Sequence, residues 1–337
     1  MAVASDYLSL TLDQGQLPIP DAAPVTNATF PEKRAIFCHP PDETLFHQSI
    51  YQPGKGTSAG VLIRHLRYNK CIASSNPGAR MLTVISPAKR LDLTPVDMSS
   101  ATEPAFKKDA HTLAKTARKL SPAELQKLMS ISEPLAELNA QRFKAFSGAP
   151  SEDAVKPAAL IFDGDTYQGL EAGTLSEADM AYAQRRLRIL SGLYGLLRPM
   201  DRIQPYRLEM GSRLKTRRGK TLYEFWGKKI AKSLNEEAEA EGTELLLNCA
   251  SQEYFGSVDL KTLKLDVIEP VFLERKEGRE KVVSFYAKNA RGAMARYVIE
   301  NRAETTEDLK EFSNGGYKYQ FEKSDAARMV FVRDYPQ

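Results

Sequence analysis

Cysteine, histidine and tryptophan are scarce in this sequence, and long apolar runs are missing. Its 337 residues include three cysteines, four histidines and one tryptophan. Three cysteines can form at most one disulfide, so a disulfide-stapled scaffold is excluded and a reducing compartment is indicated. No run reaches the ~20 apolar residues that a transmembrane helix needs, and the N-terminus has no basic and apolar signal region. We therefore expect a cytoplasmic protein with no membrane partner.

Metal and cofactor chemistry has little support in the residue types. From residue 81 onward one histidine, His111, and one cysteine, Cys249, remain, which is too few for a zinc site, and the carboxylates have no metal-binding spacing. Gly219-Lys220-Thr221 resembles the end of a phosphate-binding NTPase loop, but Leu214 stands where that loop needs glycine. Cys249 and His111 could form a nucleophile pair, whereas the apolar run before Cys249 favours an inert buried thiol. The sequence predicts no metal and no cofactor.

Residues 1–80 differ in composition from the rest of the chain. They hold 8 of the 19 prolines and 3 of the 4 histidines, and no hydrophobic periodicity persists there. Such a segment is typical of a low-complexity, disordered extension. Met81 begins the apolar, β-branched run Met81-Leu-Thr-Val-Ile-Ser86, so translation that starts at Met81 is the other interpretation. On either interpretation, we expect residues 81–337 to form one domain.

Strand and helix patterns alternate after residue 81. The strands 267–274 and 281–286 flank Lys276-Glu-Gly-Arg279 and predict a β-hairpin. Helices are expected after the N-cap residues Ser121, Ser176 and Thr221. These patterns predict a single mixed α/β domain. The apolar and β-branched runs predict strands at 81–86, 158–162, 244–249, 267–274, 281–286, 316–321 and 328–333.

The net charge of +4 is unevenly distributed along the chain. Residues 185–220 contain eleven Lys or Arg and two acids, a net charge of +9, and nine of the eleven bases are arginines. The planar guanidinium of arginine suits phosphate, and a basic zone attracts polyanions such as nucleic acid. A solvated basic face, or arginines paired with the acid-rich helix 236–241, would give the same sequence pattern.

Two features of the sequence could shape a nucleic-acid site around this charge. Gly192 and Gly195 lie in the basic window among apolar residues. A glycine-bearing hairpin between two helices can present backbone N–H groups to phosphate, although a tightly packed buried turn explains these glycines equally well. A second basic stripe carries Lys288 and Arg291 on an expected helix over 287–302. This stripe is either the opposite wall of a cationic cleft or the wet edge of an amphipathic helix.

Carboxylates in two places could support acid–base chemistry. Asp163 and Asp165 follow the apolar run 158–162, at the kind of strand end where α/β proteins bind ligands. Asp165 and Glu209 beside basic residues would form a pocket for an enzyme that acts on a nucleotide or a damaged base. A turn in which Asp caps backbone amides is the plainer interpretation. The basic residues of such a pocket would be Lys89, Arg207 and Lys288.

A set of motifs spread over residues 81–333 points to a known family. The longest is Leu190-Ser-Gly-Leu-Tyr-Gly-Leu-Leu-Arg-Pro-Met-Asp201, followed by Gln204-Pro-Tyr-Arg-Leu-Glu-Met-Gly211. With these motifs the chain resembles the YaaA family of bacterial peroxide-stress proteins. Shorter matching stretches lie at 82–89, 164–170, 222–227, 248–255 and 284–292.

The resemblance implies a protein of the hydrogen peroxide stress response that limits iron-dependent damage by keeping free iron low. It also implies a DNA partner, bound by a cationic cleft and by a helix-hairpin-helix element within 185–211 of an unusual α/β fold. Members of the family have Lys or Asn at the position of Asp163, which weakens a phosphate-contacting role for this residue and favours Asp165 as the site residue. With one histidine and one cysteine in the domain, we expect the effect on iron to be indirect. No stable protein partner is indicated. The residues that we predict to bind DNA are Lys89, Gly192, Gly195, Arg198, Arg202, Arg207, Lys288, Arg291 and Arg296.

Overall fold

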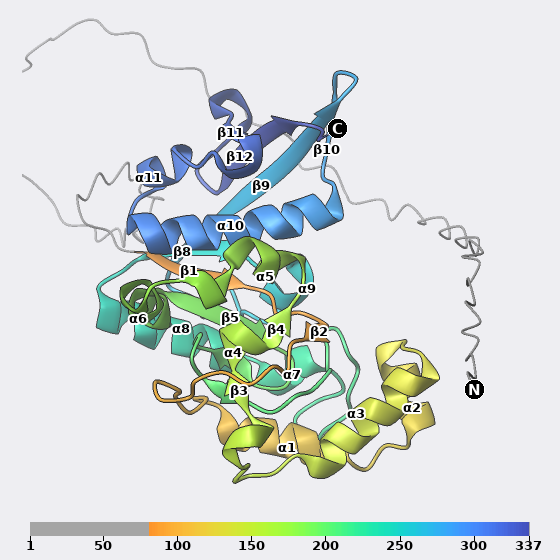
Figure 1. Ribbon diagram of the computed structural model, residues 1–337. Helices are drawn as coiled ribbons and strands as arrows, with labels where there is room; N and C mark the ends of the chain where they lie inside the picture. Colours follow the sequence, from red (N-terminus) through yellow and green to blue (C-terminus); the bar gives the residue numbers. More distant parts are fainter. Residues whose placement is uncertain (1–80, 337) are drawn as a thin grey trace, which may run out of the picture. The chain divides into compact units, whose positions relative to one another are not determined.

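A mixed sheet of eight strands forms the centre of residues 81–336, the part of the chain that the computed structural model describes (Figure 1). Its strands are β1 (Met81–Ile85), β5 (Leu187–Ser191), β6 (Gly195–Leu197), β8 (Leu245–Cys249), β9 (Asp266–Lys276), β10 (Arg279–Lys281), β11 (Lys318–Tyr319) and β12 (Arg328–Asp334). They follow the order β11-β12-β9-β8-β1-β5-β6, and β10 pairs with β9. The neighbours from β12 to β5 are parallel, whereas β6, β10 and β11 each pair antiparallel. The predicted extension, residues 1–80, lies outside the described residues.

Helices surround this sheet. They are α1 (Lys107–Ala117), α2 (Pro122–Met129), α3 (Glu133–Ala145), α4 (Ala158–Ile161), α5 (Asp165–Leu170), α6 (Glu177–Arg186), α7 (Leu222–Trp226), α8 (Lys229–Glu241), α9 (Gln252–Phe255), α10 (Ser284–Asn301) and α11 (Thr306–Lys310). Helix α10 packs along β1, β8 and β9 and against α5. Helices α1, α2 and α3 lie together at one end of the domain, away from β9 and β12 (Figure 1).

The predicted mixed α/β domain is confirmed, and so are several of its elements. The expected strands 81–86, 244–249, 267–274 and 328–333 correspond to β1, β8, β9 and β12, and the hairpin around Lys276–Arg279 joins β9 to β10. Ser121 caps α2 with the expected capping box, in which its hydroxyl accepts from Glu124 N and its N–H donates to the Glu124 carboxylate. The helix after Thr221 is interrupted at Gly227 and continues as α8 until Gly242.

Three expected strands are wrong in part. Residues 158–161 form the helix α4, and the strand β4 contains only Phe162–Asp163. Every residue of 158–162 is apolar, and a short apolar run of this kind does not distinguish a buried helix from a buried strand. β10 ends at Lys281 and residues 284–286 are the start of α10, whereas β11 covers only two residues of 316–321.

The helical hairpin expected within 185–211 is corrected to a β-hairpin. After α6 ends at Arg186, β5 and β6 pair antiparallel from Ile189–Leu197 to Ser191–Gly195, and the next helix begins at Leu222. Gly195 has φ +73°, and a Cβ on it would lie 2.7 Å from the Trp226 ring. The turn is buried, so its glycines serve close packing and do not present backbone amides to solvent. A pair of helices joined by a short connection does occur elsewhere, where residues 130–132 link α2 to α3.

Candidate functional site

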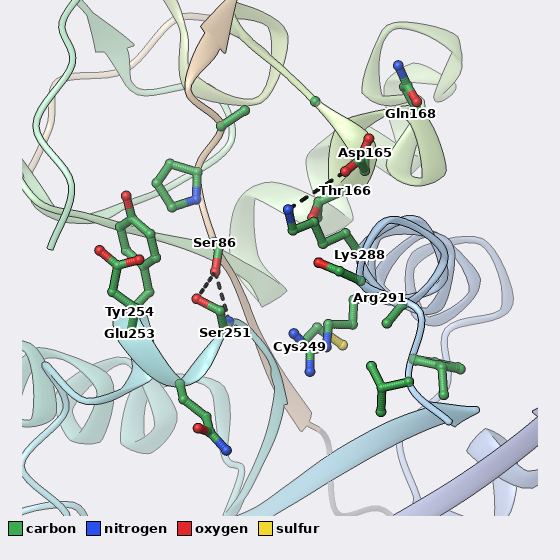
Figure 2. A pocket seen from close by; sticks show the side chains of 18 of the residues that line it. Ser86, Asp165, Thr166, Gln168, Cys249, Ser251, Glu253, Tyr254, Lys288 and Arg291 are labelled. Carbon is green, nitrogen blue, oxygen red and sulfur yellow. Dashed lines mark hydrogen bonds and ion pairs between the residues drawn. The ribbon is translucent and has the colours of Figure 1, made fainter. Parts of the chain in front are cut away.

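A cavity of about 970 Å³ opens where two neighbouring parallel strands end (Figure 2). Strand β1 leads into Ser86 and β8 into Ser251, and residues of α5, β9 and α10 complete the walls. Open α/β sheets bind their ligands at the carboxyl ends of the strands, so we take this cavity as the candidate site. Its charged lining residues are Lys89, Arg90, Asp163, Asp165, Glu253, Glu269, Lys288, Arg291 and Arg328.

Hydrogen bonds between the two strand ends fix the floor of the cavity. The backbone N–H of Ser251 donates to Ser86 Oγ at 2.9 Å, and Ser86 Oγ donates to Ser251 Oγ at 3.3 Å (Figure 2). The Tyr167 hydroxyl donates to the Ser86 carbonyl at 3.2 Å. These bonds join the loops after β1 and β8, so the side chains that follow both strands keep a defined geometry.

Three ion pairs at the cavity are looser than ordinary hydrogen bonds. Lys288 Nζ lies 3.8 Å from Asp165 Oδ2, and Arg291 lies 4.0 Å from Glu269 Oε1. Lys89 Nζ lies 3.7 Å from Glu209 Oε1 at the rim. Direct N–H···O bonds are about 2.7–3.2 Å long. These groups therefore attract one another without saturating their hydrogen-bonding capacity, and a ligand can bind between them.

Glu209 has one carboxylate oxygen without a partner. Its Oε1 accepts a hydrogen bond from Arg207 Nε at 2.9 Å, whereas its Oε2 is buried and has no hydrogen-bond partner among the described residues. A buried polar atom without a partner is costly and rare.

Five residues that the sequence analysis proposed as a pocket lie close to this cavity. They are Lys89, Asp165 and Lys288 in its lining, and Arg207 and Glu209 next to Lys89.

Glycines set the position of Asp165 relative to Lys288. A Cβ on Gly292 of α10 would lie 1.7 Å from the Thr166 carbonyl oxygen of α5, and a Cβ on Gly169 would lie 2.0 Å from the Asn289 carbonyl oxygen. The two helices therefore approach more closely than any other residue at these positions would allow. This close packing brings the N-terminal residue of α5 next to the lysine side chain of α10.

Cys249 lies at the cavity as a buried thiol. Burial raises the pKa of Cys249 to about 12, and the nearby Arg291 opposes only part of this shift. His111 packs instead against Phe146 and Gly148. Cys249 and His111 therefore do not form the nucleophile pair that the sequence allowed.

The raised pKa predicts an unreactive Cys249. At pH 8 the buried thiol stays protonated, and only the thiolate attacks alkylating reagents, so iodoacetamide should modify Cys249 about a hundredfold or more slowly in the folded chain than in urea. Mass spectrometry of the Cys249 peptide separates it from Cys38 and Cys71. Equal rates in the folded and unfolded chain would show that the thiol is accessible and ionised.

The structure adds two observations on metals and membranes for residues 81–336. No group of three or more His, Cys, Asp or Glu side chains in this range is placed to hold a metal ion. Within the same range, no helix is long and apolar enough to cross a bilayer.

Three predicted DNA-binding arginines lie away from the cavity lining. Arg198 is 4.0 Å from Glu237 of α8, and Arg202 pairs with Glu103. Arg296 pairs with Glu171 and Glu300, on the part of α10 that follows the cavity residues. The structure therefore does not gather all of the predicted basic residues in one cleft. Of the nine predicted residues, Lys89, Lys288 and Arg291 line the cavity.

Most of the bases in the basic window are paired with carboxylates. Six of its eleven bases form ion pairs with carboxylates from other segments or from Glu209. Arg186 and Arg188 are buried and pair with Glu241 and Glu237 of α8, as the alternative interpretation of the window expected. The other four paired residues are Arg198, Arg202, Arg207 and Arg218.

Residues 213–220, which we call the basic loop, keep their charge exposed. Arg213, Lys215, Arg217 and Lys220 are exposed and form no ion pair with any other residue of the described range. Arg218 anchors the loop, because it pairs with Asp109 of α1 at 2.7 Å and stacks on Phe225. The segment that leads into the loop lies at the cavity rim, where Gly211 N donates to Glu253 Oε1 at 2.9 Å.

Sequence reasoning missed several lining residues. Ser251 and Glu253 follow β8 as Ser86 follows β1, so the end of the expected strand 244–249 was a usable signal. Glu269 and Arg328 come from β9 and β12. Nothing in their local sequence distinguishes them from other charged strand residues, and only the pairing of the strands brings them to the cavity.

Comparison with known proteins gives a consistent result. The family model described as "Peroxide stress protein YaaA" matches residues 81–323. The UPF0246 protein of Ruegeria pomeroyi is 58% identical over 255 residues, which cover 76% of this chain and 99% of the relative. The UPF0246 proteins of Dinoroseobacter shibae and Aliivibrio fischeri are 56% and 50% identical, and the alignments cover 76% and 75% of this chain and 96% and 98% of those relatives. The chain therefore belongs to the YaaA family of peroxide stress proteins.

Proposed function

We propose that this protein binds DNA during the response to hydrogen peroxide, with the basic loop as its main phosphate-contacting surface. The observation that carries the proposal is the set of four exposed, unpaired bases in residues 213–220, beside a window whose other arginines are mostly neutralised. Unpaired Lys and Arg side chains displace counterions from DNA, which supplies most of its non-specific affinity. Under this proposal, damage by iron is limited at the DNA and needs no metal site on the protein.

Helix α1 extends the basic surface beyond the loop. Arg218 holds the loop against Asp109 of α1. On the same helix Lys108 and Lys115 are exposed. They are seven residues apart and so lie on one face of the helix. A duplex that contacts the loop can therefore reach further lysines on α1.

The charges that line the cavity do not favour binding of a DNA backbone along it. Asp163, Asp165, Glu253 and Glu269 line it together with the basic residues. These carboxylates would repel a row of phosphates at close range. We therefore place the continuous phosphate contacts on the loop and α1, and we revise the expected cationic cleft accordingly.

DNA binding can be measured by the fluorescence anisotropy of a labelled random-sequence duplex. With four to six phosphate contacts, we expect the affinity to fall about a hundredfold to a thousandfold between roughly 50 and 200 mM salt. The absence of binding by micromolar protein at low salt would contradict the proposal, and so would an affinity that does not change with salt.

A second candidate is an enzyme that acts on a nucleotide or a damaged base, with Asp165 and Glu209 as its acid–base residues. It is favoured by the unpartnered buried oxygen of Glu209 and by the loose pair of Asp165 with Lys288. Asp165 in the cavity lining and Glu209 at its rim are groups that can exchange protons with a bound ligand.

Asp165→Asn separates the two candidates, because it keeps the size of the side chain and removes its charge. If the protein is an enzyme, the variant should keep its DNA affinity within about twofold and lose the protection of cells against hydrogen peroxide. Full protection by Asp165→Asn would argue against catalysis by this carboxylate. Survival of a strain that carries only the variant chain is the measurement.

A further inference from the structure

The charges that line the cavity select a ligand with both acidic and basic features. Lys288, Arg291 and Arg328 can bind an anion, and Arg328 is exposed with no ion pair to another residue in 81–336. Asp165 and Glu269 can accept hydrogen bonds from donor groups of a ligand. A single phosphate attached to a ring that carries N–H donors satisfies both sets. A run of phosphates satisfies only the first set.

The loose ion pairs mark where such a ligand would bind. Lys288 and Arg291 project into the cavity from one face of α10, each 3.8–4.0 Å from a carboxylate (Figure 2). A phosphate between the two cations would form charge-assisted hydrogen bonds, which are shorter and stronger than these contacts. The volume of about 970 Å³ is at the upper end of the ~300–1,000 Å³ of small-molecule sites and admits a nucleotide with water.

An exposed apolar surface borders these charges. Phe285 lies just outside the cavity lining, between the lining residue Ser284 and Lys288 on α10. Its side chain is 50% exposed, and its ring centroid lies 3.9 Å from that of Tyr286, which leaves part of the ring open to solvent. Val282 also lines the cavity and is 55% exposed. An exposed phenyl ring next to phosphate-binding cations is the arrangement on which unpaired bases stack.

The cavity is also continuous with the proposed DNA-binding surface. The basic loop begins two residues after Gly211, whose N–H is bonded to the lining residue Glu253. A DNA strand that extends from Arg213 toward Gly211 would therefore reach the cavity rim. Enzymes and readers of single bases hold an extruded nucleotide in a pocket beside a backbone-binding surface of this kind.

We propose that the cavity binds one unpaired nucleotide unit, with its base stacked on Phe285 and its phosphate between Lys288 and Arg291. This inference rests on the proposed DNA binding, because the main source of such a nucleotide is an unpaired position in a bound duplex. A free 5′-mononucleotide has the same chemistry and is the other source. The base edge then faces Asp165 and Glu269.

The test compares two duplexes that differ only in one central nucleotide, which is fully paired in the first and faces an abasic position in the second. We expect the wild-type chain to prefer the duplex with the unpaired nucleotide. Phe285→Ala should lower the affinity for this duplex about tenfold, as expected from the loss of one stacking contact, and leave the affinity for the paired duplex unchanged. Phe321→Ala is the matched control, because Phe321 is 73% exposed and its neighbours in the chain, unlike those of Phe285, contribute nothing to the cavity lining.

The outcomes separate this inference from the proposed function. Equal affinity of the wild-type chain for both duplexes, together with no binding of free dAMP or dTMP, would overturn the nucleotide site while DNA binding by the loop stands. Equal losses in Phe285→Ala and Phe321→Ala would overturn the role of Phe285. Binding of free dAMP or dTMP that Phe285→Ala and Lys288→Ala weaken, without a preference for the unpaired duplex, would support the site and assign it to free nucleotides. Thermal unfolding of each variant checks that the fold is intact.

Discussion

Replacing Arg213, Lys215, Arg217 and Lys220 together by serine is expected to lower the affinity for a random-sequence duplex about a hundredfold at about 0.1 M salt. All four side chains are exposed and have no carboxylate partner among residues 81–336. Their removal therefore costs no internal ion pair and leaves no buried charge behind. Arg218, which anchors the loop to Asp109, is left in place so that the loop keeps its position. The measurement is an anisotropy titration with labelled duplex.

A matched control removes the same charge from other parts of the surface. Lys232, Lys261, Lys264 and Lys318 are exposed and form no ion pair with any residue that the structure describes. Their replacement by serine changes the net charge by the same four units. We expect this variant to keep its affinity within about threefold, because distant exposed charges are screened by salt. Equal losses in both variants would show that net charge, and not the loop, determines binding.

Glu237→Ala is expected to lower the free energy of unfolding by about 3 kcal/mol. Glu237 pairs with Arg188, whose guanidinium is buried between β5 and α8. Burial lowers the pKa of Arg188, and the carboxylate of Glu237 opposes this shift. Removal of the carboxylate leaves a positive charge inside the protein with only backbone carbonyls as acceptors. Urea denaturation followed by circular dichroism measures the change.

Two further variants show whether the buried charge is the cause. Glu239 lies on the exposed side of α8, so Glu239→Ala should change the stability by less than about 0.5 kcal/mol. Adding Arg188→Met to Glu237→Ala removes the unpaired charge and should restore most of the loss, since an apolar residue of similar volume is tolerated at such a position. If the double variant is less stable than Glu237→Ala, the account of Arg188 as a buried charge is wrong.

The sequence was most informative where a strand ends. The apolar runs before Ser86 and Ser251 predicted β1 and β8, and these two strands pair in parallel and open the cavity. Lys89, Asp165 and Lys288 were proposed as parts of one polar pocket, and the structure places all three in its lining. For Lys89 the position after a strand was sufficient, because strand ends in a parallel sheet converge. Asp165 instead follows α4 and the short strand β4, and Lys288 lies on α10, so their residue types alone pointed to the pocket.

The partners of the arginines could not be predicted in the same way. Arg202 pairs with Glu103 and Arg218 with Asp109, about a hundred residues away in each case. A basic window in the sequence contains no information on which carboxylates fold onto it. Strand β5 was missed for a related reason. Arg188 breaks its apolar pattern, although the side chain is buried and pairs with Glu237 of α8.

The salt dependence of DNA binding by the wild-type chain and by the variant with serine at residues 213, 215, 217 and 220 tests the central claim most directly. Each phosphate contact contributes about 0.9 to the slope of log K against log salt concentration. If the four side chains contact phosphates, the slope of the variant should be smaller in magnitude by about 3 to 4. Identical slopes for the two proteins on the same duplex would mean that DNA does not contact this loop, and the account would be contradicted.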